Sequence, residues 1–219
     1  MLMTMTSPRS EARTARGRTP SRGERQVDGE RTRAALLDAA LDEFTAKGFA
    51  GARVRDIATR AGVSKDLVAY HFGGKDGLYL AVQEAWLRRE DTFSDPDLPL
   101  TELVARYLRD ALTDPRPLRL LLWRGLTDPD HAPPDADPEA EDLTATRARQ
   151  QHGELPDDIE PAMLRLLLLA AVAAPVAFPD TTVRLFGTSL DDPSFEERYL
   201  QGLRGLLAHL SSAAATSAQ

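Results

Sequence analysis

The sequence predicts an all-α protein, in which an N-terminal three-helix domain with a helix-turn-helix is followed by a helical C-terminal domain. Three observations lead to this prediction. Apolar residues recur with the 3.6-residue spacing of amphipathic helices along most of the chain. No segment shows the sustained apolar and polar alternation of a half-buried strand. Gly62 separates two short apolar stripes, as the tight turn of a helix-turn-helix does.

The first helix is expected between Arg31 and Gly48. A glycine readily adopts the left-handed conformation that ends a helix, and the apolar positions before Gly48 fall on one helical face. These positions are Ala34, Leu37, Ala40, Leu41 and Phe44. Residues 1–28 are rich in Arg, Ser, Thr, Gly and Pro and lack an apolar period, so a disordered basic tail is predicted there.

A helix-turn-helix motif is predicted from Arg53 to Phe72. Its first helix carries an apolar stripe over barely two turns, which ends at Gly62. The members of the stripe are Val54, Ile57, Ala58 and Ala61. Because the second helix of such a motif lies in the major groove, the chain is expected to bind DNA.

The recognition helix is predicted to follow Ser64, a favourable N-cap residue, and to end at about His71. Val63 and Val68 have the spacing of a hydrophobic staple, which fixes the angle at which the chain enters the helix. A fourth amphipathic helix is expected to complete a DNA-binding domain over residues 29–89.

The remaining helices are predicted to form a C-terminal domain over residues 90–212. They are expected at residues 100–113, 117–126, 137–152, 158–177 and 194–210. The stretch 127–142, rich in Pro and Asp, should be a loop that leads into a helix, and residues 213–219 should be a disordered tail.

The charge is unevenly distributed along the chain. The net charge of -7 argues against a protein that coats nucleic acid nonspecifically, because such binding depends on neutralising phosphates. Residues 1–33 nevertheless hold eight basic and four acidic side chains. A DNA-facing front end would have this asymmetry, and so would a basic tail without a role in binding.

The composition also bounds compartment and chemistry. The chain has no cysteine, which excludes disulfides, thiolate nucleophiles and cysteine metal sites. The longest uncharged apolar run, Leu166 to Phe178, contains Pro175 and is shorter than the roughly 20 residues that a membrane span needs. The N-terminus has no hydrophobic signal region, so a cytoplasmic protein without a membrane partner is expected.

The segment from Ala34 to Trp86 resembles the N-terminal domain of TetR-family regulators. The resemblance rests on VRDIA at 54–58, AGVSK at 61–65 and YHFGGK at 70–75, at nearly gap-free spacing. A softer similarity covers Thr182 to Leu207. The resemblance implies a homodimer that binds a palindromic double-stranded DNA operator and releases it when an unknown small molecule enters the C-terminal domain. It thereby implies a repressor.

Within this family the motif implies specific DNA contacts. Lys65 and Lys75 lie at helix starts, where ammonium groups, backbone N–H groups and the helix dipole favour phosphates. Tyr70 and His71 can donate hydrogen bonds to phosphate. The complete set of predicted DNA-binding residues is Arg53, Arg55, Ser64, Lys65, Asp66, Leu67, Tyr70, His71 and Lys75.

Base contacts are expected from Asp66 and Leu67. A carboxylate can accept from cytosine N4, and a leucine can pack on a thymine methyl. Asp66 could equally favour the positive end of its helix without touching a base. His71 is assigned to phosphate or packing rather than to a metal, because the other histidines lie far away in the sequence.

The sequence departs from the family pattern around this motif. Arg53 replaces the usual Thr or Ser cap, Asp66 and Leu67 replace a common Gly-Thr pair, and Ala69 replaces an aromatic residue. Arg53 and Arg55 could restore phosphate affinity as salt-sensitive contacts. A further hypothesis is an arm in the minor groove, formed by Arg16, Arg18, Arg22 and Arg25.

The C-terminal domain offers candidates for dimerisation and for ligand binding. An almost wholly apolar helix and a final apolar stripe are expected to pair with a second copy. The predicted interface residues are Leu164, Leu168, Phe195, Tyr199, Leu203, Leu206 and Leu210. The residues predicted to line a ligand pocket, which could equally be ordinary core, are Trp86, Tyr107, Trp123 and Met163.

Two alternatives stay open at this point. An enzyme is disfavoured, because the sequence has no glycine-rich phosphate loop, nucleophile elbow or histidine pair at metal spacing. No catalytic residue, metal or cofactor is therefore predicted. The other alternative is a helix-turn-helix protein that acts without a ligand, as a constitutive repressor or an architectural protein. A cavity in the C-terminal domain would favour the ligand-responsive regulator.

Overall fold

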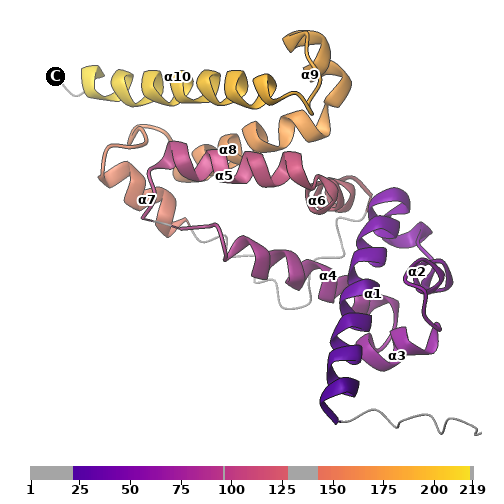
Figure 1. The fold of residues 1–219 in the computed structure, drawn as a ribbon. Helices are drawn as coiled ribbons and strands as arrows, with labels where there is room; N and C mark the ends of the chain where they lie inside the picture. The colour runs from indigo at the N-terminus through magenta and orange to yellow at the C-terminus, as the bar shows by residue number, and fades with distance from the viewer. Residues whose placement is uncertain (1–21, 96, 128–142, 218–219) are drawn as a thin grey trace, which may run out of the picture.

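The computed structural model describes residues 22–95, 97–127 and 143–217, which form helices and turns without a strand (Figure 1). The predicted all-α fold is confirmed. The helices are α1 (Arg22–Gly51), α2 (Val54–Arg60), α3 (Asp66–Phe72), α4 (Lys75–Glu90), α5 (Leu100–Thr113), α6 (Arg116–Thr127), α7 (Thr144–Gln151), α8 (Pro161–Ala177), α9 (Pro179–Phe186) and α10 (Pro193–Ser217).

Helix α1 is longer than expected at its N-terminal end. It begins at Arg22, so the predicted disordered tail is wrong for residues 22–28, while residues 1–21 lie outside the described residues. Arg22 is therefore part of a helix and not of an extended arm. The expected end of the helix at Gly48 coincides with a kink, where this glycine has φ 67°.

The buried face of α1 is rotated slightly from the predicted stripe. Leu36, Ala40 and Phe44 are fully buried at i, i+4 and i+8, whereas the predicted Ala34 is exposed. Phe44 and Phe49 both contact the ring of Tyr79 on α4, with centroids 5.1 Å and 5.0 Å apart. These contacts hold α4 against α1.

One hydrophobic core joins α1–α4 into an N-terminal domain and includes a residue of α6. Its buried members are Leu36, Ala39, Ala40, Phe44, Ala52, Ile57, Ala58, Val68, Leu78, Tyr79, Val82 and Leu120. Val54 and Val63, which the sequence places at apolar positions, are partly buried against it, and so is Phe72 at the end of the motif. The first helix of the C-terminal domain to follow the linker, α5, packs against α8 and α10 instead.

The C-terminal domain is centred on α5. Val104 of α5 packs with Leu164 and Val172 of α8, and Leu108 on another face of α5 packs with Leu200 of α10. Helix α10 lies on the side of α5 that faces away from the N-terminal domain (Figure 1). The long axis of the molecule therefore runs from the helix-turn-helix to α10.

The C-terminal domain differs from the prediction at α9 and at the end of α10, and part of a third predicted helix lies outside the described residues. Helix α9 was not predicted; Pro179 begins it directly after α8, with the chain bent at Phe178. Helix α10 continues to Ser217, so the expected disordered tail is wrong for residues 213–217. Helix α7 begins at Thr144, and the segment 128–142, including the start of the helix expected at 137, lies outside the described residues.

The apolar character of α8 raises the question of a membrane span. Within the described residues, no single helix is long and apolar enough to cross a bilayer. Helices α8 and α9 taken together would satisfy the length and composition of a span, but the chain bends by 90° between them.

Candidate nucleic-acid interface

The turn of the helix-turn-helix is closed by backbone hydrogen bonds. The N–H of Gly62 donates to Thr59 O at 3.1 Å, and the N–H of Val63 donates to Ala58 O at 3.0 Å. Gly62 has φ 71°, a conformation that costs a glycine little. The predicted break at this glycine is therefore confirmed, and α2 and α3 follow each other after a tight turn.

Packing on one side of α3 leaves its other side open to solvent. Val68 is fully buried, and Leu67 and Phe72 are partly buried against the same core. The opposite side presents Asp66 and Tyr70, both exposed. Part of the Leu67 side chain, which was predicted to contact a base, is therefore buried against the domain core.

The beginning of α3 differs in detail from the prediction. The helix starts at Asp66, and Lys65 before it makes no side-chain capping bond. Ser64, predicted as the N-cap, is exposed, and its carbonyl oxygen accepts the N–H of Leu67 at 3.2 Å. Ser64 and Lys65 thus lie at the open end of the recognition helix, where backbone N–H groups favour an anion.

The junction of α3 and α4 is formed by two glycines. Gly73 has φ 73° and donates its N–H to Ala69 O at 2.9 Å, and Gly74 has φ 133°. Lys75 then opens α4, as the sequence indicates. Its ammonium lies 4.5 Å from the ring centroid of Phe49 and 3.4 Å from Ala50 O, so it is held against the end of α1.

Aromatic rings gather at the C-terminal end of α3. Tyr70 is 80% exposed, and its ring meets the half-buried ring of His71 edge-on at 5.0 Å. The guanidinium of Arg33 on α1 lies 5.1 Å from the ring centroid of Phe72. Sequence reasoning did not select Arg33, because its contact depends on how α1 packs beside α3.

Two further predicted phosphate contacts come from the start of α2. Arg53 precedes the helix in an extended conformation and is exposed. The side chain of Arg55 is 77% exposed and lies 3.7 Å from Asp56, which is also 3.6 Å from Lys47. Arg55 is therefore accessible, with part of its charge offset by a neighbouring carboxylate.

The four residues predicted to line a ligand pocket lie in different surroundings. Trp86 is half-buried on α4, Met163 is half exposed on α8, and Tyr107 is half-buried on α5. Trp123 is 39% exposed on α6 and lies against Gly48, where its ring would contact an added Cβ atom at 3.6 Å. Trp123 therefore lies at the contact with the N-terminal domain.

Tyr107 ties the end of α4 to α5. Its hydroxyl donates to Glu90 Oε1 at 2.5 Å, and the hydroxyl oxygen of Tyr107 also lies 3.1 Å from Ser94 Oγ. The pKa of Tyr107 is raised to about 12. Burial is the larger cause, and the hydrogen bond to the Glu90 carboxylate is the second. This side chain is already satisfied inside the protein.

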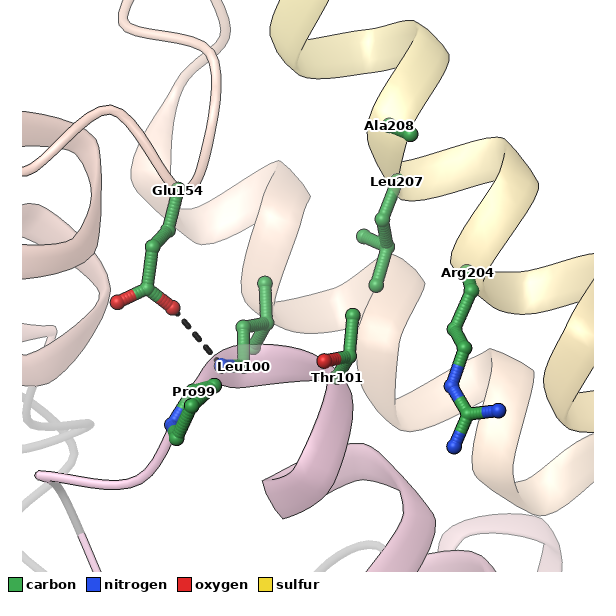
Figure 2. A pocket seen from close by; sticks show the side chains of 7 residues that line it. All are labelled: Pro99, Leu100, Thr101, Glu154, Arg204, Leu207 and Ala208. Atoms are coloured by element: carbon green, nitrogen blue, oxygen red, sulfur yellow. Dashed lines mark hydrogen bonds between the residues drawn. The ribbon is translucent and has the colours of Figure 1, made fainter.

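A hollow lies elsewhere, between the start of α5 and α10. Its volume is about 240 Å³, and Figure 2 shows Glu154 on one side of it and Arg204 on the other. Leu100 and Leu207 contribute its apolar lining. A carboxylate oxygen of Glu154 accepts the N–H of Leu100 at 2.8 Å. None of the four predicted pocket residues lines this hollow.

The predicted dimer residues divide into three groups by their exposure. Leu164 and Phe195 are 2% and 0% exposed within their own protomer, so they are not available to a second copy, and their assignment to an interface is wrong. Leu168, Tyr199, Leu203 and Leu210 are partly buried. Leu206 is 60% exposed.

Helix α8 exposes more apolar side chains than the sequence analysis assigned to the interface. They are Met163, Leu166, Leu167 and Leu169, all at least 42% exposed.

No group of three or more His, Asp or Glu residues in the described chain is arranged to hold a metal ion.

Two family models match this chain, one in each domain. "Bacterial regulatory proteins, tetR family" matches residues 36–82, and "Tetracyclin repressor-like, C-terminal domain" matches residues 98–195. The first match covers the helix-turn-helix, and the second covers α5 to the start of α10.

Curated relatives share a moderate part of the sequence. The HTH-type transcriptional repressor SCO4008 of Streptomyces coelicolor is 33% identical over 152 residues, which cover 67% of this chain and 78% of that protein. The HTH-type transcriptional regulator RutR of Escherichia coli is 37% identical over 99 residues, or 41% of this chain and 46% of that protein. The alignment with RutR thus spans less than half of either protein.

Solved structures share the fold. The transcriptional regulator SCO4942 of Streptomyces coelicolor superposes with a TM-score of 0.65 at 23% identity, over 80% of this chain and 97% of that chain. The TetR-family protein CprB of the same species gives 0.55 at 21% identity, over 82% and 97%. Together with the matches above, these findings show that the chain belongs to the tetR family of bacterial regulatory proteins and is a DNA-binding transcriptional regulator.

Proposed function

We propose that this regulator is a homodimeric repressor, which binds a palindromic operator through two copies of α3 and leaves it when a small molecule occupies the C-terminal domain. The exposure of the recognition helix carries the DNA-binding part of the proposal. Asp66, Ala69 and Tyr70 are exposed on one side of α3 while Val68 anchors the other side. A helix held in this way can enter the major groove without losing its own core.

The nine predicted DNA contacts differ in how free they are. Arg53, Ser64, Lys65, Asp66 and Tyr70 are exposed and can meet DNA directly. The ammonium of Lys75 already contacts the Phe49 ring and Ala50 O. Lys75 can therefore bind a phosphate only while it keeps these contacts or by giving them up. Phosphate contacts position the protein, and base contacts from α3 supply the specificity.

The apolar surface of α8 supports the dimer. Met163 and Leu166 lie one turn apart on this helix and are 50% and 61% exposed, and Leu206 on α10 is exposed as well. Large exposed apolar side chains gathered on one helix are unfavourable in water and are typical of a protein contact. A second copy placed by a two-fold axis would cover the same surface on both protomers.

The ligand part of the proposal rests on family membership and on the hollow between α5 and α10. At about 240 Å³, this hollow is smaller than the roughly 300–1,000 Å³ of most small-molecule sites. A ligand of ordinary size therefore requires the C-terminal domain to open. A regulator that acts without a ligand is the competing function.

Selection of binding sites from random duplex DNA, followed by fluorescence anisotropy, tests the proposal. We expect selected sites to be palindromic and to bind two protomers in the presence of excess unrelated duplex. Tyr70→Ala on α3 should weaken binding, whereas Leu126→Ala, at an 84% exposed site on α6, should not. Selection without enrichment of any sequence would contradict specific DNA binding.

A compound screen tests the release step separately. Compounds that raise the melting temperature of the free protein bind the folded state. We expect at least one such compound to weaken operator binding. If stabilising compounds leave operator affinity unchanged, repression without a ligand becomes the better account.

A further inference from the structure

Arg116, at the start of α6, connects the two domains through three carboxylates. Its NH1 atom lies 2.9 Å from Asp38 Oδ1 and 2.7 Å from Asp42 Oδ1, both on α1. Its Nε and NH2 atoms donate to the two carboxylate oxygens of Asp114, at 2.8 Å and 2.9 Å. One guanidinium therefore joins a helix of the DNA-binding domain to the α5–α6 connection.

The ion pairs continue from Arg116 in both directions. Asp42 also lies 3.4 Å from Arg60 on α2, the first helix of the helix-turn-helix. Asp114 lies 3.6 Å from Arg89 near the end of α4, and Arg89 reaches Asp110 on α5 at 2.5 Å. We define the Arg116 network as Arg60, Asp42, Asp38, Arg116, Asp114, Arg89 and Asp110.

The centre of this network is partly buried and bidentate. The side chains of Asp114 and Arg116 are 17% and 31% exposed. Their hydrogen bonds are bidentate, so they fix the orientation of the two groups as well as attracting them. The hydrogen bonds from Arg116 hold the pKa of Asp114 below its ordinary value. The planar fork is a property of arginine that lysine cannot reproduce.

The same junction also contains a hydrogen bond and apolar packing. Thr45 on α1 donates to the carbonyl oxygen of Arg116 at 3.2 Å, and Leu120 enters the N-terminal core. Apolar packing is non-directional, whereas the guanidinium must lie in the plane of Asp114 while it reaches Asp42. A rotation of α1 against α6 therefore disturbs the hydrogen bonds that Arg116 makes to Asp38 and Asp42.

We propose that Arg116 is a positioning residue for DNA binding: it sets the angle at which the C-terminal domain holds the helix-turn-helix, and thereby the spacing of the two recognition helices. This inference rests on the dimeric repressor proposed above. A dimer reads two half-sites at a fixed separation, so an error in that angle weakens binding to the palindrome. Binding of one helix-turn-helix to one half-site does not depend on the angle.

The test compares Arg116→Met and Arg116→Lys with Arg119→Met, an exposed residue of the same helix. Each folded variant is titrated onto the selected palindrome, onto a single half-site and onto palindromes with altered spacing. We expect Arg116→Met to bind the palindrome about tenfold more weakly, the change that corresponds to about 1.4 kcal/mol. Its affinity for the half-site should be unchanged and its preference for one spacing should broaden.

Arg116→Lys should lie between Arg116→Met and the wild type, and Arg119→Met should match the wild type. Equal losses on the palindrome and the half-site would mean a general structural defect and would overturn the proposal. So would an unchanged spacing preference in Arg116→Met. If that variant does not fold, the spacing preference of Arg116→Lys decides, because this variant keeps the charge.

A second measurement separates this proposal from the proposed function. The chain has no cysteine, so spin labels at Thr59→Cys on α2 and Gln201→Cys on α10 report the angle between the domains without interference. Dilution with unlabelled chain restricts the signal to one protomer. We expect Arg116→Met to broaden this distance distribution, and an unchanged distribution would overturn the positioning role. If the wild type selects no DNA, the proposed function fails, and the label distances alone decide whether Arg116 sets the angle.

Discussion

Leu118 and Leu120, two residues apart on α6, pack into different hydrophobic cores. Leu118 lies against the cluster of the C-terminal domain, and Leu120 is 6% exposed within the cluster of the N-terminal domain. Residues at i and i+2 point to nearly opposite sides of a helix, because each residue turns it by about 100°. Helix α6 is therefore shared between the two domains.

Replacing Leu120 by alanine should destabilise the N-terminal domain. Truncation of a buried leucine costs about 2–5 kcal/mol, since apolar surface is lost and a cavity remains. In calorimetry of Leu120→Ala, we expect the N-terminal domain to unfold at a lower temperature than the C-terminal domain. Leu121→Ala, at a 37% exposed neighbouring site, should have a much smaller effect. Equal effects of the two variants would contradict a shared core.

Lys65 and Lys75 should respond differently to alanine substitution. Lys65 is exposed before α3, so Lys65→Ala should weaken operator binding and lower the salt dependence of affinity by about one unit of slope, without a change in stability. Lys75 contacts Phe49 and Ala50, so Lys75→Ala should also reduce the free energy of unfolding, by about 0.5–1 kcal/mol. Anisotropy at several salt concentrations and urea denaturation measure these effects.

An equal loss of stability in the two lysine variants would mean that Lys75 is not held by its own domain. Lys47→Ala provides a further comparison, because Lys47 pairs with Glu43 and Asp56. It should lower stability while leaving the salt slope of operator binding unchanged.

The DNA-binding motif could be predicted from the sequence because its signals are local. Gly62 has the positive φ that the turn needs, and Val63 and Val68 pack into one core as their spacing predicts. Helix α9 was not predicted, because it is only eight residues long and follows α8 after a single bend. Short helices that depend on tertiary packing carry little periodic signal.

The contacts between distant elements could not be predicted in the same way. Arg116 and Asp42 are 74 residues apart, and their pairing follows from the packing of α6 on α1. Leu164 and Phe195 stand on clear apolar stripes, but a stripe does not specify whether its own domain or a second copy covers it. The sequence therefore predicts the helices and the motif more fully than the junction and the interface.

Tyr107 should make stability sensitive to alkaline pH. Its pKa is raised from 10 to about 12, so the folded state favours the neutral phenol. The stabilisation is complete below pH 10 and is lost as the pH rises from 10 towards 12. Urea denaturation of Tyr107→Phe should therefore depend less on pH in this range than that of the wild type.

Burial also raises the pKa of Tyr199, so some pH dependence should persist in Tyr107→Phe. A pH dependence in Tyr107→Phe equal to that of the wild type would show that Glu90 and burial do not hold the phenol neutral.

Leu166→Glu should convert the proposed dimer to a monomer. Leu166 is 61% exposed within its protomer, so the substitution costs little stability in a single chain. Within a dimer interface, however, the carboxylate would be buried without a partner, and a central contact of this kind contributes about 2 kcal/mol or more to association. Light scattering should show the mass of one chain, and binding to the palindrome should weaken while binding to a half-site persists. Leu126→Glu, at an 84% exposed site on α6, should remain a dimer. A dimeric Leu166→Glu would place the interface away from α8.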